Sequence, residues 1–139
     1  MNTYEVKLKG YKQDEKGIRK PAKMKYIVKD AVSCADAENS ALVECANILD
    51  EAEAISVQKK VIYDFFNADH DRLWYVNLKE TILDDLTAKE HSITHLYVVG
   101  ADNTKEASNV ILKELSGLDC EVVKISDSKV DVLMNSMTK

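Results

Sequence analysis

The chain has 139 residues and a formal net charge of −5 at pH 7; this is the length of one ordinary domain, long enough to bury a core without a metal or a disulfide. Hydrophobic residues make up 45% and charged residues 31%, with one Pro and four Gly, which excludes collagen-like, disordered and transmembrane classes. The isoelectric point of about 5.2 argues against a generic nucleic-acid-coating protein, because such proteins carry an excess of Lys and Arg.

The sequence matches itself when it is shifted by 70 positions without a gap. Identical residues recur at fourteen of 69 positions and run along the whole chain; examples are Val6/Val76, Ala37/Ala107 and Ile55/Ile125. Such self-similarity at a fixed spacing is typical of a duplicated structural unit. We therefore predict one domain, residues 1–139, built of two repeats, residues 1–69 and 70–139, with a polar joint at residues 67–71.

Each repeat is expected to begin with a β-hairpin. Apolar and polar residues alternate at the start of both halves, which is the pattern of a half-buried strand. Acidic residues then mark polar loops that precede a second strand. The expected segments are first strands at 4–8 and 74–78, loops at 14–17 and 84–85, and second strands at 24–31 and 93–101.

A helix and a third strand follow in each repeat. Ser33 and Asn103 are good N-cap residues, with Asp36 and Glu106 three positions later, as in a capping box. Third strands are expected at 54–66, a long one, and at 121–126, and residues 134–139 are expected to fray. The predicted fold is α+β: a tandem β-β-α-β unit whose mainly antiparallel sheet carries two helices on one face. Whether the strands form one sheet or two stays open.

Most signatures of chemistry are absent from the sequence. Three cysteines form no metal-binding spacing, and the scattered glycines form no phosphate-binding loop. His91 and His95 lie four apart on an expected strand, roughly 13 Å from each other at about 3.3 Å per residue, which is too far to share one ion. We therefore expect no catalytic residue, no metal and no cofactor. A hydrolase remains the weakest alternative, with candidates at Asp69, His70, Asp71, Asp84 and Asp85.

The strand faces opposite the helices carry the most suggestive residues. By alternation, the first hairpin presents lysines there and the second presents aromatic and polar side chains. Ammonium groups bind phosphates, and aromatic rings stack on bases. The candidate ligand-binding residues are Lys7, Lys9, Lys23, Lys25, Arg72, Tyr75, Asn77 and Tyr97. The alternative is a solvated lysine face beside a self-association patch containing Tyr75, Tyr97 and Val99.

Two stretches of the sequence resemble a known family. Residues 26–38, Tyr-Ile-Val-Lys-Asp-Ala-Val-Ser-Cys-Ala-Asp-Ala-Glu, and residues 65–85, with the Trp74-Tyr75-Val76 strand and the Asp84-Asp85 turn, resemble an uncharacterised family of small proteins of Bacteroidetes genomes and their phages. The resemblance covers nearly the whole chain, and its motifs mark strand, cap and turn positions. It implies a bacterial cytoplasmic protein, with a phage gene as one source, and implies no activity.

Two function hypotheses follow from these observations. The first is a non-enzymatic, homo-oligomeric protein, encoded by a phage or mobile element, that captures a nucleotide-like anion such as a host-defence signal on the Lys/Tyr face. The alternative is a protein-interaction or DNA-associated accessory factor that uses the same basic face. Nucleic acid is the less favoured partner, because the whole chain is acidic, and no membrane contact is expected because no apolar run approaches the roughly 20 residues of a membrane span.

Overall fold

The computed structural model describes residues 2–137 and contains two compact units. One unit comprises residues 2–61 and 130–137, and the other comprises residues 62–129. The chain passes from one unit to the other twice, at Val61–Ile62 and at Lys129–Val130. The fold is α+β, as predicted, and it holds two separate four-stranded sheets, which answers the question that the sequence left open.

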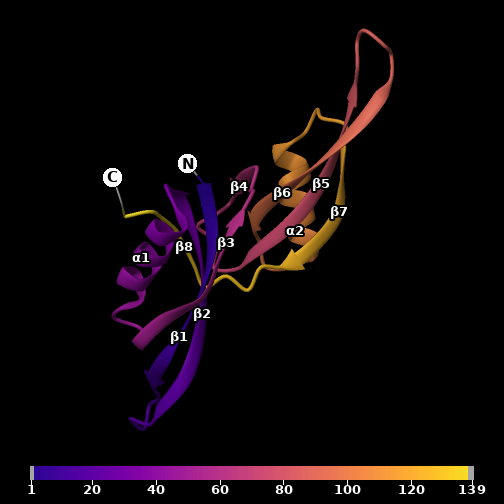
Figure 1. Cartoon of the computed structure of the whole chain (residues 1–139). Helices are drawn as coiled ribbons and strands as arrows, with labels where there is room; N and C mark the ends of the chain where they lie inside the picture. The colour runs from indigo at the N-terminus through magenta and orange to yellow at the C-terminus, as the bar shows by residue number, and fades with distance from the viewer. Residues whose placement is uncertain (1, 138–139) are drawn as a thin grey trace. The chain divides into compact units, whose positions relative to one another are not determined.

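The first unit is a sheet with one helix on it (Figure 1). Its elements are β1 (Asn2–Gln13), β2 (Arg19–Ala31), α1 (Cys34–Cys45), β3 (Asp50–Lys60) and β8 (Val132–Asn135), and the strand order is β3-β1-β2-β8. β1 is antiparallel to both of its neighbours, whereas β8 is parallel to β2. Alternate side chains of β1 and β2, among them Val6, Leu8 and Tyr26, pack with Ala37 and Ala41 of α1.

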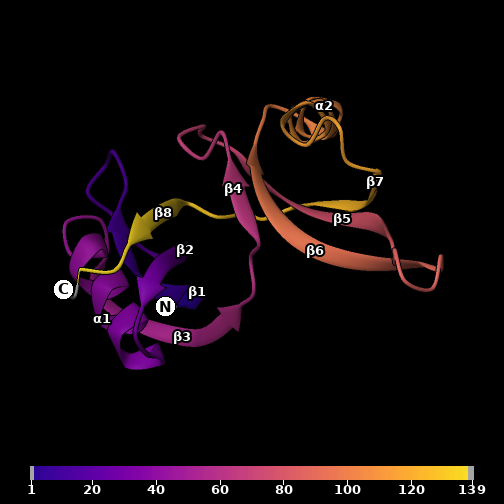
Figure 2. The ribbon, with the colours of Figure 1, turned by 90° about the horizontal axis from the view of Figure 1, so that it is seen from above.

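The second unit has the same strand order. Its elements are β4 (Asp64–Phe66), β5 (Leu73–Leu83), β6 (Glu90–Gly100), α2 (Thr104–Glu114) and β7 (Cys120–Asp127), in a sheet ordered β4-β6-β5-β7. β5 is antiparallel to β6 and β7, and β4 is parallel to β6. Figure 2 shows α2 lying on one face of this sheet, where Ala107 and Ile111 pack against Trp74, Val76 and other core residues.

Both helices begin where the sequence predicted. Ser33 and Asn103 have extended backbones, and their side chains accept hydrogen bonds from the backbone N–H groups of Asp36 and Glu106. The two carboxylates reach back one residue further than in the usual capping box. Asp36 accepts from the N–H of Val32, at 2.9 Å, and Glu106 accepts from that of Asp102, at 3.2 Å.

The loops of the two hairpins differ in length by one residue, and this difference sets which side chains of the second strand face the helix. Gln13 pairs with Arg19 in the first hairpin, which leaves loop residues 14–18, whereas Leu83 pairs with Glu90 in the second, which leaves 84–89. A bulge in β2, with Asp30 at a φ of 58°, restores the 70-residue spacing before the helices. Residues of β2 between the loop and the bulge therefore correspond to residues of β6 one position beyond the 70-residue spacing. Tyr26, for example, corresponds to Tyr97.

Two predictions about the strands were wrong. The expected long strand at 54–66 is broken: β3 ends at Lys60, and β4 joins the sheet of the other unit. Residues 132–135, expected to fray in part, form β8, and the N–H of Met137 donates to Ser40 Oγ at 3.0 Å. Residues 138–139 of that prediction lie outside the described residues. Parallel pairing with a strand distant in the sequence leaves no local pattern, which is why both strands were missed.

Candidate functional site

The lysines of the first hairpin lie on the sheet face opposite α1, as the alternation predicted. Lys7 pairs directly with Lys25 across β1 and β2, and Lys9 pairs directly with Lys23. Four ammonium groups therefore share one face of a two-stranded ladder. Like charges that lie directly opposite each other destabilise a sheet, so this arrangement needs anions nearby, from the protein itself or from a ligand.

Acidic side chains of the same unit balance two of these four lysines. Lys9 Nζ lies 2.9 Å from Glu53 Oε1 of β3, and this hydrogen bond and charge raise the pKa of Lys9 above its usual value. Lys25 Nζ lies 3.7 Å from Glu5 Oε1, whose side chain is buried. Within residues 2–137, the side chains of Lys7 and Lys23 have no ion pair. These two are the lysines with charge available to a ligand.

A small cavity of about 190 Å³ opens beside these lysines. Its lining includes Lys9, Tyr11, Pro21, Lys23, Glu51 and Glu53. The guanidinium group of Arg19 lies 4.1 Å above the centre of the Tyr11 ring and pairs with Glu51 at 3.0 Å. Sites that enclose drug-sized ligands measure roughly 300–1,000 Å³. This cavity can therefore hold a phosphate or a sugar, while the rest of a nucleotide would lie on the open sheet face.

The remaining candidate residues lie in the second unit. Tyr75 and Asn77 point away from α2 and are half-buried. Arg72 is engaged by its own unit, since its guanidinium lies 3.1 Å from Asp127 Oδ2 and 4.3 Å from the centre of the Trp74 ring. The candidate lysines lie in the first unit and Tyr75 lies in the second, so neither unit by itself holds both.

The expectation that Tyr97 lies beside Tyr75 on the outer face is wrong. Tyr97 pairs with Val76, belongs to the core under α2 and is 2% exposed. Its ring contacts those of Tyr63 and Phe66, and burial raises the pKa of its phenol. His95 and Val99 share this face by alternation. The physical reason is the longer second loop, which shifts the alternation of β6 by one residue relative to β2.

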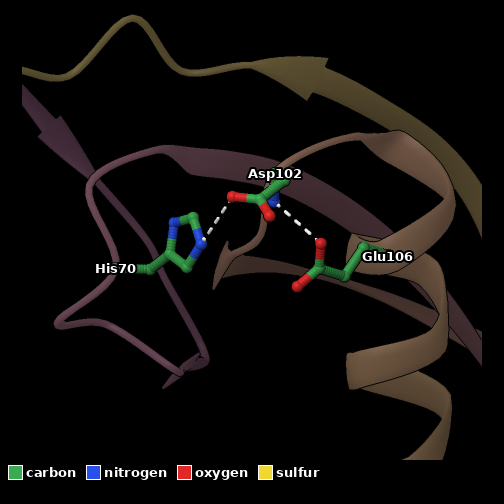
Figure 3. Close-up of side chains that lie close together, drawn as sticks. All are labelled: His70, Asp102 and Glu106. Atoms are coloured by element: carbon green, nitrogen blue, oxygen red, sulfur yellow. Dashed lines mark hydrogen bonds and ion pairs between the residues drawn. The ribbon is translucent and has the colours of Figure 1, made fainter.

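His70, Asp102 and Glu106 form the only group within residues 2–137 with three side chains placed closely enough to hold a metal ion. Figure 3 shows His70 on the loop before β5 and the two carboxylates at the start of α2. Their ligand atoms lie within 4.8 Å of one another. His70 Nε2 is 2.9 Å from Asp102 Oδ1.

The hydrogen bonds of His70 argue against a metal or a general base at this cluster. The backbone N–H of Arg72 donates to His70 Nδ1 at 3.1 Å. In neutral imidazole one nitrogen accepts and the other donates, so Nε2 carries the proton that points to Asp102. Both ring nitrogens are thus occupied, and a metal on Nε2 would require the opposite tautomer. Glu106 meanwhile holds the N–H of Asp102, so the cluster ties the loop to the start of α2.

Comparison with known proteins places the chain in a family. A family model described as Domain of unknown function (DUF4494) matches residues 2–135. The chain belongs to this family. No curated protein and no solved structure matches it. Neither helix of the DUF4494 chain, within the described residues, has the length and apolar character needed to cross a membrane.

Sequence reasoning missed three residues of the lysine face in this DUF4494 protein. Tyr11 follows Lys9 by two positions on β1, so the alternation that selected the lysines also places its ring on their face. Glu5 precedes Lys7 by two positions and follows the same rule. Glu53 could not be found in this way, because its pairing with Lys9 depends on the register of β1 with β3, which includes two irregularities.

Proposed function

We propose that this DUF4494 protein is a non-enzymatic binding protein that captures a small phosphate-bearing molecule, such as a nucleotide, on the lysine face of its first unit. The observation that carries the proposal is that two lysines of β1 each lie directly opposite a lysine of β2, in the pairs Lys7/Lys25 and Lys9/Lys23. Only two of these four side chains have an acidic partner within the described residues. An anion that lies between the other two removes the repulsion that the ladder creates.

The geometry of the two unpaired lysines fits one phosphate. Lys7 and Lys23 are diagonal neighbours on β1 and β2, and such positions lie about 7–8 Å apart, within reach of long side chains. A phosphate offers several acceptor oxygens, so each ammonium group can donate to a different one. The Lys9–Glu53 pair is exposed, and exposed ion pairs are weak, so a dianion could displace Glu53 at little cost.

The Tyr11 ring supplies the second contact. The ring lines the cavity together with Lys9 and Lys23. The planar guanidinium group of Arg19 already lies over it. Stacking of a base on an aromatic side chain is worth about 1–3 kcal/mol. A nucleobase would therefore either replace Arg19 on the ring or stack on its guanidinium, while the phosphate lies at the lysines.

The proposal is tested by calorimetry and thermal unfolding of the full chain with inorganic phosphate, nucleoside monophosphates and cyclic dinucleotides. A ligand that binds only the folded state stabilises it by about 2.7 kcal/mol at 100 times its Kd. We expect at least one of these compounds to bind and to raise Tm. The double variant Lys7→Gln/Lys23→Gln should lose this effect, whereas Lys59→Gln, which removes an exposed lysine of β3, should keep it.

Two results would contradict the proposal. Flat titrations with every compound would remove the ligand class, and unchanged binding by Lys7→Gln/Lys23→Gln would remove the site. The alternative of a DNA-associated accessory factor rests on the same opposed lysines, because a two-stranded basic ribbon fits a major groove. Its signature is duplex binding that weakens steeply with salt, with a slope of about −0.9 for each phosphate contacted, in a protein that ignores free nucleotides.

The proposal extends to the origin and setting of the protein. In both units the third strand of the repeat lies beside its first strand, the first beside its second, and an added strand, β8 or β4, pairs with the second in parallel. These parallels support a tandem duplication. The sequence resemblance supports a Bacteroidetes or phage setting and a role in the bacterial cytoplasm, where a homo-oligomer would sequester its ligand.

A further inference from the structure

Both hairpins end in exposed two-stranded tips of opposite charge. We define the basic tip as residues 11–21 and the acidic tip as residues 81–92; they extend from the paired positions Tyr11/Pro21 and Thr81/Ser92. Beyond Tyr11 and Thr81 neither ribbon pairs with a third strand within the described residues. Figure 1 shows each tip extending past the helix of its own unit.

The charges of the two tips are complementary. The basic tip carries four basic and two acidic residues, and the acidic tip carries three acidic residues and one lysine. Within residues 2–137, Lys12 and Lys16 have no ion pair, and neither do Asp85 and Glu90. The tips thus present charges of +2 and −2, and the side chains that would meet a partner are not already engaged.

Each tip also exposes an apolar side chain among its charges. Leu86, in the loop of the acidic tip, is 96% exposed, and Leu83 next to this loop is 57% exposed. Ile18 of the basic tip is 52% exposed. A leucine at a loop tip contributes nothing to the core of its own unit, and apolar residues gathered on a protruding ribbon are typical of an interaction surface.

We infer that the basic tip of one copy docks on the acidic tip of a second copy of this chain. The contact joins Lys12 and Lys16 to Asp85 and Glu90, with Ile18 and Leu86 covered between them. Because each copy carries both tips, two copies can satisfy both contacts in a closed dimer, or many can join head to tail. The contact does not use Lys7 or Lys23, so it holds whether or not the lysine face binds a ligand.

The test is sedimentation velocity of the full chain without nucleotide, over a range of protein and salt concentrations. We expect association that grows with protein concentration at 50 mM salt and is lost toward 1 M salt, because the Debye length falls from about 10 Å at 0.1 M to about 3 Å at 1 M. Lys12→Glu/Lys16→Glu gives a chain with two acidic tips, and Asp85→Lys/Glu90→Lys gives a chain with two basic tips. Each should self-associate about tenfold more weakly than the native chain, as removal of complementary charge predicts.

Mixing the two variants makes the test specific to contacts between copies. The acidic-tipped and basic-tipped chains should associate with each other more strongly than either associates with itself. Lys59→Glu/Lys124→Glu makes the same change of charge as Lys12→Glu/Lys16→Glu, but on strands outside the tips. It should associate like the native chain. Three results would overturn the inference: a native chain that stays monomeric at low salt, variants that self-associate like the native chain, or a mixture that stays monomeric.

Discussion

Lys7 lies directly opposite Lys25 on the face of the first sheet that faces away from α1. Like charges in this position destabilise a sheet, and cross-strand pairs in general contribute about 0.2–1 kcal/mol. We therefore predict that Lys7→Thr raises the free energy of unfolding by an amount in this range at low salt, and that the gain shrinks in high salt. Urea denaturation at two salt concentrations measures it, with Lys59→Thr as the control. A loss of stability in Lys7→Thr at low salt would show that the pair does not repel.

Tyr26 holds the one buried side-chain oxygen without a hydrogen-bond partner among residues 2–137. Burial raises the pKa of this phenol to about 12. A buried polar group without a partner costs about 1–3 kcal/mol. Tyr26→Phe keeps the ring and removes the hydroxyl, so we predict an unfolding free energy higher by about 1 kcal/mol, measured in urea. A decrease of similar size would mean that the hydroxyl has a partner in solution.

Asp127 is expected to make stability depend on pH. The backbone N–H of Lys129 and then the guanidinium of Arg72 lower the pKa of this carboxyl. A carboxyl with a lowered pKa adds stability above its unfolded-state pKa of about 3.9, and this stability is lost as the pH falls through the folded-state pKa. Unfolding free energies at pH 7 and about pH 3 should therefore differ less in Asp127→Asn than in the native chain. An equal difference would exclude this carboxyl as a source of acid sensitivity.

Gly100 ends β6 where the loop from β4 crosses it. A Cβ at this position would overlap the carbonyl oxygen of Asn67 and the side chain of His70, and the Asn67 side chain donates to the Gly100 carbonyl at 2.9 Å. We predict that Gly100→Ala costs more than about 2 kcal/mol, since backbone atoms cannot yield easily. Gly17→Ala is the comparison. Gly17 has a φ of 76° and open space around it, so its cost should stay near 1 kcal/mol. Thermal unfolding measures both, and equal costs would refute the crowding argument.

The sequence predicted the local elements well because their signals are local. The alternation in β1 and β5 and the caps at Ser33 and Asn103 depend on neighbouring residues only, and all are confirmed. The short strands β4 and β8 were not found as such, because their pairing depends on β6 and β2, which are distant in the chain. Three residues can form a strand here because a partner strand is already in place.

The residues of the candidate site were likewise predicted correctly only where the local pattern is unambiguous. The lysines of β1 and β2 were placed on the correct face because they alternate with apolar residues from Val6 to Lys9 and with Met24 from Lys23 to Lys25. In β6 the residues from Leu96 to Val99 are apolar in both phases, so the pattern could not decide which of them faces α2. The error at Tyr97 follows from this ambiguity and from the one extra loop residue.

The most direct test of anion binding at the lysine face is an NMR titration of the full chain, labelled with ¹⁵N, with inorganic phosphate and then with a nucleoside monophosphate. Binding at this face predicts shifts confined to amides of β1 and β2 near Lys7, Tyr11 and Lys23, larger with the nucleotide, and absent in Lys7→Gln/Lys23→Gln. Shifts that gather elsewhere in the chain, or a spectrum that neither compound changes, would contradict it.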